Sequence, residues 1–124
     1  METAFYFKNM VAKDEEILRE YVLQKLDKFE RMVSGYPKDA VVFEIKAERF
    51  EKHNAYEIEF LLKLPSEILT ATEASHFITK AVDKAKARLE VQLKKHIDSA
   101  RKHKTVKGGK SATVGAMLAE GINA

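Results

Sequence analysis

The chain has 124 residues, the size of one domain, and 45% of them are hydrophobic, enough to form a core of its own. It contains no cysteine, which excludes disulfide bonds and thiolate metal sites, and no stretch approaches the roughly 20 apolar residues that span a membrane. The overall charge of +3 combines a net −4 over residues 1–79, a net +8 over residues 80–110 and the single negative charge of Glu120. Because the N-terminus shows no signal-peptide pattern, we expect a cytoplasmic protein with no membrane partner.

A strand over residues 3–8 and a helix that ends near Met32 are the first predicted elements. Asp14 is placed to cap the start of this helix with its side chain. Gly35, in a left-handed conformation, and Pro37 would end it. The helix should bury one face, because its apolar residues recur at intervals of three and four: Leu18, Val22, Leu26, Phe29 and Val33.

Two segments of strict alternation follow and predict paired strands with one packed face and one open face, joined by a turn over residues 52–54. The side chains expected to pack are Val41, Phe43, Ile45, Ala47, Tyr56, Ile58, Phe60, Leu62 and Leu64. The side chains expected on the open face are Glu44, Lys46, Glu48, Glu57, Glu59 and Lys63. A shorter strand is predicted over residues 68–72.

A long helix is predicted from about residue 74 to residue 102, with a buried arc formed by Ala74, Phe77, Ile78, Ala81, Ala85, Leu89 and Leu93. The order strand, helix, three strands, helix predicts an α+β fold (β-α-β-β-β-α), a four-stranded sheet with two helices packed on one face. We expect this domain to cover residues 1–104. Residues 105–124, rich in glycine and small side chains, are predicted to form a flexible C-terminal tail.

The long helix carries a row of cations on one flank, beside the predicted buried arc. Successive members of the row are four, four, seven and seven residues apart: Lys80, Lys84, Arg88, Lys95 and Lys102. Like charges four residues apart destabilise a helix by a few tenths of a kcal/mol per pair, so helix stability does not favour this row. A role in binding phosphate groups would account for this row of cations. From charge alone, a polyanion binder and an ordinary lysine-rich surface helix both remain open.

The first helix adds a second basic row, formed by Lys25, Lys28 and Arg31 beside its buried stripe. Packed on one sheet face, the two helices would place their rows on either side of a shallow groove. Sheets that bind RNA display aromatic side chains on their open face. Here Phe43, Tyr56 and Phe60 belong to the packed set and the open face is acidic. We therefore expect RNA to contact the helices and not the sheet.

No catalytic or metal-binding constellation is apparent. The four histidines, His53, His76, His96 and His103, have no acidic partners at metal-ligand spacing. The serines lack a nucleophile motif. The segment KGGKS at residues 107–111 lacks the frame and the preceding strand of a phosphate-binding loop. The sequence thus predicts neither an enzyme nor a bound cofactor or metal.

Several segments together resemble the ribosome hibernation-promoting factor family, also called ribosome-associated inhibitors or sigma-54 modulation proteins. These are LREYV (residues 18–22), KLDKFER (25–31), VVFEIK (41–46), EILTATE (67–73) and LEVQLKKH (89–96). The similarity covers about residues 5–104, and the order and spacing of the segments carry it. The chain is similar to the short members of the family. It departs from many relatives at Val91, where they have arginine.

The resemblance implies a fold related to double-stranded-RNA-binding domains and a role as a translation inhibitor. Such a protein would bind ribosomal RNA in the decoding channel of the small ribosomal subunit and block the mRNA and tRNA sites, within whole ribosomes or ribosome dimers. The basic positions of the family carry over to Lys25, Lys28, Arg31, Arg88 and Lys95. Lys80, Lys84 and Lys102 rest on helix geometry alone. The alternative is a protein-interaction module that modulates a transcription (sigma) factor.

Overall fold

The structure of the protein is a computed structural model that describes the backbone of residues 1–109 and the side chains of residues 1–100. The chain forms two compact units, because residues contact one another mainly within Met1–Glu90 and within the segment from Val91 onward. Each unit is described by itself. The elements, in chain order, are β1 (Glu2–Lys8), α1 (Ala12–Met32), the 3-10 turn η1 (Lys38–Ala40), β2 (Val42–Phe50), the 3-10 turn η2 (Glu51–His53), β3 (Ala55–Lys63), β4 (Ile68–Ser75) and α2 (Ile78–Gly109).

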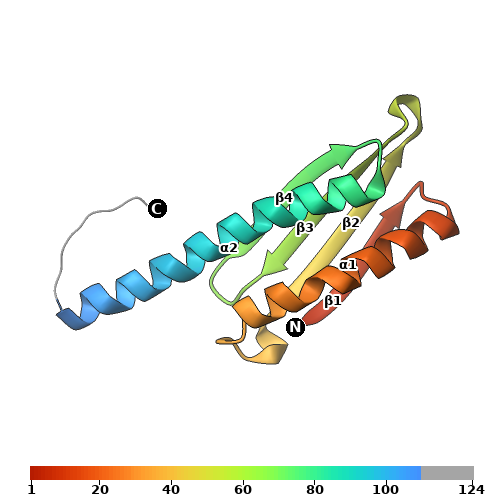
Figure 1. Cartoon of the computed structure of the whole chain (residues 1–124). Helices are drawn as coiled ribbons and strands as arrows, with labels where there is room; N and C mark the ends of the chain where they lie inside the picture. The colour runs from red at the N-terminus through yellow and green to blue at the C-terminus, as the bar shows by residue number, and fades with distance from the viewer. Residues whose placement is uncertain (110–124) are drawn as a thin grey trace. The chain divides into compact units, whose positions relative to one another are not determined.

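The four strands form one mixed sheet in the order β1-β2-β3-β4. β1 runs parallel to β2, and the other neighbours are antiparallel. A parallel pair needs a long crossover, and α1 provides it. Both α1 and the first turns of α2 cover the same face of the sheet (Figure 1). The predicted α+β architecture is confirmed.

The core lies between this face and the helices. All five residues of the predicted stripe on α1 are buried. The predicted packed residues of β2 and β3 are buried as well, except Tyr56, which is half-buried. At the centre, the rings of Phe29 and Phe43 are 5.5 Å apart, and those of Phe43 and Phe60 are 5.2 Å apart in an edge-on arrangement. Such aromatic pairs stabilise a core beyond the area that they bury.

α1 ends at Met32 as predicted, but the capping of both its ends differs from the prediction. Val11 precedes the helix with no side-chain hydrogen bond to it, so Asp14 is not the cap. Instead the Asp14 carboxylate accepts a hydrogen bond of 2.8 Å from the Tyr56 hydroxyl, which ties α1 to β3. No glycine of the described residues has a positive φ, so Gly35 does not end α1 in a left-handed conformation. The last turn closes instead through a bond of 3.2 Å from the Ser34 N–H to the Arg31 carbonyl.

The junction between β4 and α2 also differs from the prediction. β4 continues to Ser75, because backbone pairing with β3 extends through Glu57↔Ala74 and Tyr56↔Ser75. α2 therefore begins at Ile78, four residues later than predicted. Ala74 and Phe77 are exposed, where the sequence predicted them to be buried.

The buried residues of α2 within the first unit are Ile78, Ala81, Val82, Ala85 and Leu89. The helix ends at Gly109 and not near Lys102, so residues 105–109 of the predicted tail are helical. The rest of that predicted tail lies outside the described residues. In the part of the chain that the structure describes, no helix has the length and hydrophobicity to cross a membrane.

Candidate nucleic-acid interface

The basic row of α1 borders α2. The Lys25 ammonium lies 4.8 Å from the centre of the Tyr21 ring, a cation–π distance. Lys28 forms an ion pair of 3.1 Å with Glu90 of α2. Arg31 is exposed in the last turn of α1, where a cation interacts favourably with the negative end of the helix dipole. The structure therefore keeps these three cations on the helical face of the molecule.

The flank of α2 that faces α1, here called the inner flank, consists of Asp83, Lys86 and Glu90. The Tyr21 hydroxyl lies 2.9 Å from both carboxylate oxygens of Asp83 and donates to them. One oxygen of Glu90 accepts hydrogen bonds of 3.1 Å from both Lys28 and Lys86. These contacts join the two helices side chain to side chain, and both carboxylates accept hydrogen bonds.

These contacts shift two pKa values. Partial burial alone would raise the pKa of Glu90, but the hydrogen bonds from Lys86 and Lys28 and the charges of these lysines outweigh it, so the pKa falls below its usual range. The hydrogen bond to Asp83, with smaller contributions from burial and the carboxylate charge, raises the pKa of Tyr21. Both shifts stabilise the protonation states that hold α1 against α2 near neutral pH.

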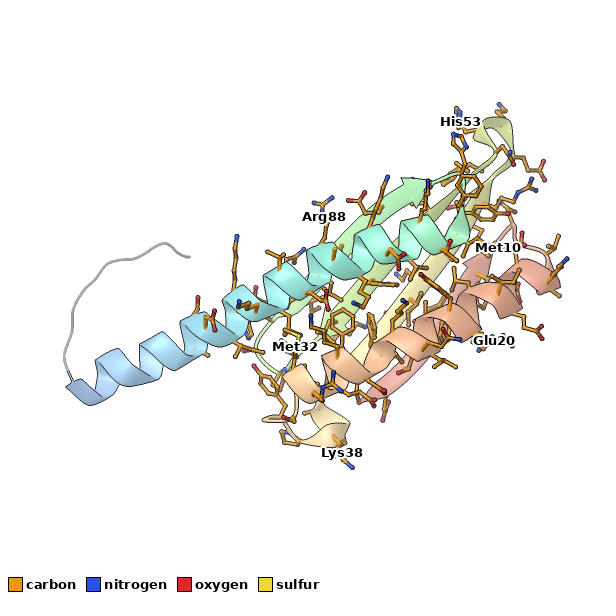
Figure 2. The ribbon with its side chains drawn as sticks, in the orientation of Figure 1. Met10, Glu20, Met32, Lys38, His53 and Arg88 are labelled. Carbon is orange, nitrogen blue, oxygen red and sulfur yellow. The ribbon has the colours of Figure 1, made fainter. Side chains whose placement is uncertain are left out.

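The opposite flank of α2, here called the outer flank, carries Lys80, Lys84 and Arg88. Arg88 pairs with Glu73 of β4, and Figure 2 shows its side chain leaving α2 on the side away from α1. The Arg88 side chain nevertheless stays 61% exposed. Lys80 lies 5.2 Å from the centre of the Phe77 ring, and Lys84 is exposed with no ion pair among the described residues. The outer flank thus has a surplus of positive charge.

This arrangement corrects the predicted groove. The row of α1 faces the inner flank of α2, whereas the row of α2 occupies the outer flank, beside β4. Asp83 and Glu90 fill the seam between the helices with ion pairs and hydrogen bonds. The two rows therefore share the helical face of the molecule but do not face each other across an open groove.

The remaining two predicted residues belong to the second unit. Lys95 is exposed on α2. Lys102 lies within the helical backbone of α2, and its side chain is outside the described part. RNA contact by any of the eight residues stays a prediction.

The open face of the sheet agrees with its predicted chemistry. Glu44, Glu48, Glu57 and Glu59 all lie on the face away from the helices, and Glu44 is paired at 3.0 Å with Lys63. Phe43 and Phe60 are buried on the other face. Among the described residues of this open face, the exposed aromatic residues are Tyr6, at 51%, and Phe50 at the end of β2, at 36%.

Sequence reasoning missed several residues of the helical face. The ion pair of Lys86 with Glu90 has a local signal, because the two are four residues apart on one helix. The hydrogen bond between Tyr21 and Asp83 has no local sequence signal, because 62 positions separate the two residues. Phe77 was assigned to the core by its helical spacing and is in fact at the surface.

No metal site was predicted, and the described part of the chain brings no three histidine, aspartate or glutamate side chains close enough to hold a metal ion.

Comparison with known proteins adds the family. A family model described as sigma 54 modulation protein / S30EA ribosomal protein matches residues 5–101. The N-terminal domain of Thermus thermophilus Protein Y is 24% identical, with a TM-score of 0.61 over 77% of this chain and 99% of that one, which shows a shared fold. A ribosomal subunit interface protein from Coxiella burnetii is 17% identical over 77% of this chain and 98% of its own, with a TM-score of 0.49. No curated protein matches the chain. Since the family model spans most of the sequence, the chain belongs to the sigma 54 modulation protein / S30EA ribosomal protein family, as its motifs predicted.

Proposed function

We propose that this protein is a translation inhibitor that binds the small ribosomal subunit through its helical face and occupies the decoding channel, where it blocks the mRNA and tRNA sites. The observation that carries the proposal is the cationic outer flank of α2 in a chain that belongs to a family with ribosomal proteins. Steric occlusion needs no catalytic group. The site of action would be the cytoplasm, where ribosomes work.

The distribution of charge supports contact with RNA phosphates. Lys80, Lys84 and Arg88 follow one another at intervals of four residues, so neighbouring charges repel. Glu73 offsets Arg88, but Lys84 has no ion-pair partner among the described residues. A polyanion would supply the missing negative charge, and each phosphate contact would release counterions and add salt-sensitive affinity.

The open face of the sheet is poorly suited to RNA, which also favours binding through the helices. This face has an excess of carboxylates, which repel a phosphate backbone. In addition, Phe43 and Phe60 at the centre of the sheet are buried on the face that the helices cover, whereas RNA-binding sheets display central aromatic side chains on their open face. RNA would therefore be held by Lys25, Lys28 and Arg31 of α1 and by the cations of α2, with shape providing specificity.

Sedimentation of ribosomes with added protein tests this proposal. The informative variant reverses Lys80, Lys84 and Lys95 to glutamate and leaves Arg88 in place, because Arg88 is paired with Glu73. We expect the wild-type protein to migrate with small subunits at low salt and to be released as the salt concentration rises. The triple variant should remain at the top of the gradient while keeping its helical circular-dichroism spectrum.

The matched control reverses Lys38, Lys46 and Lys52, which lie in η1, on the open face and in η2. This control changes the net charge equally and should still bind. Equal loss of binding in both variants would show that only net charge matters, and binding that survives the first triple change would contradict the proposal. Salt-resistant association with a sigma factor in place of ribosomes would favour the protein-interaction alternative.

A further inference from the structure

Phe77 is the most exposed of the large hydrophobic side chains in the described part of the chain, at 61%. It occupies the position just before α2, and the ammonium of Lys80 lies 5.2 Å from the centre of its ring. Surface phenylalanine is ordinary when isolated. Here the ring stands beside Lys80, one of the cations that would contact phosphate under the proposed function.

The backbone of Phe77 is held on both sides. Its N–H donates to the Ser75 hydroxyl at 3.3 Å, and its carbonyl accepts the N–H of Ala81 at 3.1 Å. The preceding residue, His76, is tied by a ring nitrogen to the carbonyl of Asn54 in the β2–β3 connection at 3.0 Å. The exposed ring therefore projects from a fixed support.

Helix periodicity places Phe77 at the head of the outer flank. It precedes Lys80, Lys84 and Arg88 by three, seven and eleven residues, intervals that fall on one side of a helix at about 100° per residue. Surfaces that bind single-stranded nucleic acids combine an aromatic ring, on which a base stacks, with neighbouring cations that contact the phosphates.

We propose that Phe77 is a stacking platform for an unpaired base of an RNA strand whose phosphates contact Lys80 and Lys84. This inference rests on the proposed function and adds a base contact to it. Stacking on phenylalanine tolerates every base, because each base presents an aromatic face. The contact therefore favours single-stranded over double-stranded RNA without selecting a sequence.

An apolar protein partner fits this position less well. Burying the Phe77 ring under a hydrophobic surface would also remove the neighbouring Lys80 ammonium from water, which is costly for an unpaired charge. A nucleotide satisfies both groups, since its base covers the ring and its phosphate pairs with the cation. Lys80 can in this way change from a cation–π contact to a phosphate contact when RNA binds.

The absence of tryptophan from the sequence provides a direct test. Phe77→Trp introduces a single fluorescent reporter at the platform, and Tyr6→Trp introduces one on the acidic open face, where the exposure is similar at 51%. The probe is a ten-nucleotide oligouridylate at low salt, compared with an abasic oligomer of the same phosphate number. We expect the oligouridylate to quench Phe77→Trp, the abasic oligomer to leave it nearly unchanged, and Tyr6→Trp to respond to neither.

Affinity for the same oligomer provides the second readout. Phe77→Ala should weaken binding of oligouridylate about tenfold or more, Phe77→Tyr should retain it, and neither should alter binding of the abasic oligomer. Absent quenching, equal quenching by the abasic oligomer, or unchanged affinity of Phe77→Ala would overturn the inference. Ribosome sedimentation separates this failure from that of the proposed function. Ribosomes that still bind the wild type would leave the proposed function standing, whereas stacking of the oligomer without ribosome binding would refute that function alone.

Discussion

The two flanks of α2 within residues 78–90 use charge in different ways. On the inner flank, Asp83 accepts from Tyr21, and Glu90 accepts from Lys28 and Lys86. On the outer flank, cations follow one another, and Glu73 of β4 pairs with Arg88. One side of a helix is thus nearly neutralised by its own protein, and the other side retains surplus positive charge.

The difference indicates what each flank is for. Matched charges in a partly buried seam stabilise the position of one helix against another. Unmatched charges at the surface repel each other slightly and contribute nothing to the fold. They are available to an external polyanion, and mutation should therefore separate stability from ribosome binding along a single helix.

The largest expected effect concerns Lys84 and Lys86, two lysines on different flanks. Lys84→Ala removes an exposed cation with no ion pair among the described residues. We expect its affinity for ribosomes to fall roughly tenfold near 0.1 M salt, and the slope of log affinity against log salt to become shallower by about one. The measurement is a binding titration at several salt concentrations. Its free energy of unfolding should not change.

Lys86→Ala is the matched control. The Lys86 side chain is 22% exposed and is held by Glu90, so it contributes to the seam between the helices. This variant should lose stability in urea denaturation and keep most of its affinity. If both lysines affected affinity alike, the distinction between the flanks would be wrong.

The next effect in size concerns Glu90, whose side chain is 18% exposed. A single substitution at this position weakens its contacts with both Lys28 and Lys86. Glu90→Gln keeps the shape of the side chain and removes its charge. We expect the free energy of unfolding to fall by about 1–2 kcal/mol, because charge-assisted hydrogen bonds to Lys28 and Lys86 are weakened. Affinity for ribosomes should stay the same or rise slightly, since both lysines gain freedom to contact phosphate.

The pH dependence of this difference has a definite sign. The pKa of Glu90 is lower in the folded protein than its usual value of 4.5, so its contribution to stability is present above that value and is lost as the pH falls through the folded pKa. The stability gap between wild type and Glu90→Gln should thus be constant from pH 7 to about 5 and close on further acidification. A gap that widened in acid would mean that Glu90 is held by something other than these lysines.

Much of the fold was predictable because burial imposes a period on the sequence. The alternation of β2 and β3 and the stripe of α1 are read from neighbouring residues, and both are confirmed. The junction at Ala74 and Phe77 was not predictable in this way. Its apolar residues fit the spacing of a helix and also the continuation of a strand, and backbone pairing of β4 with β3 decides between the two.

The candidate site divides along similar lines. The row of Lys80, Lys84 and Arg88 follows from helical spacing alone, and these cations do share one flank of α2. Which flank faces α1 depends on contacts such as Tyr21 with Asp83, between residues far apart in sequence. No local pattern reports that contact, and the predicted groove between the two rows was wrong for this reason.

The smallest expected effects compare two tyrosines that each donate to an aspartate on another element. Tyr56 bonds to Asp14 at 2.8 Å in a partly buried position, and Tyr21 bonds to Asp83 at 2.9 Å at the exposed rim of the seam. Removal of each hydroxyl by substitution with phenylalanine should lower the free energy of unfolding by about 1 kcal/mol at Tyr56 and by only a few tenths at Tyr21, because water replaces the exposed bond more readily.

The hydrogen bonds to Asp14 and Asp83 raise the pKa values of Tyr56 and Tyr21 above the usual 10.0. Each bond therefore contributes fully below pH 10 and is lost as the pH rises through the folded pKa. Urea denaturation at pH 7 and at alkaline pH should show both variants approaching the wild type in alkali. A larger loss for Tyr21→Phe than for Tyr56→Phe would mean that the seam between α1 and α2, rather than the attachment of α1 to the sheet, determines how firmly the basic row of α1 is held in place.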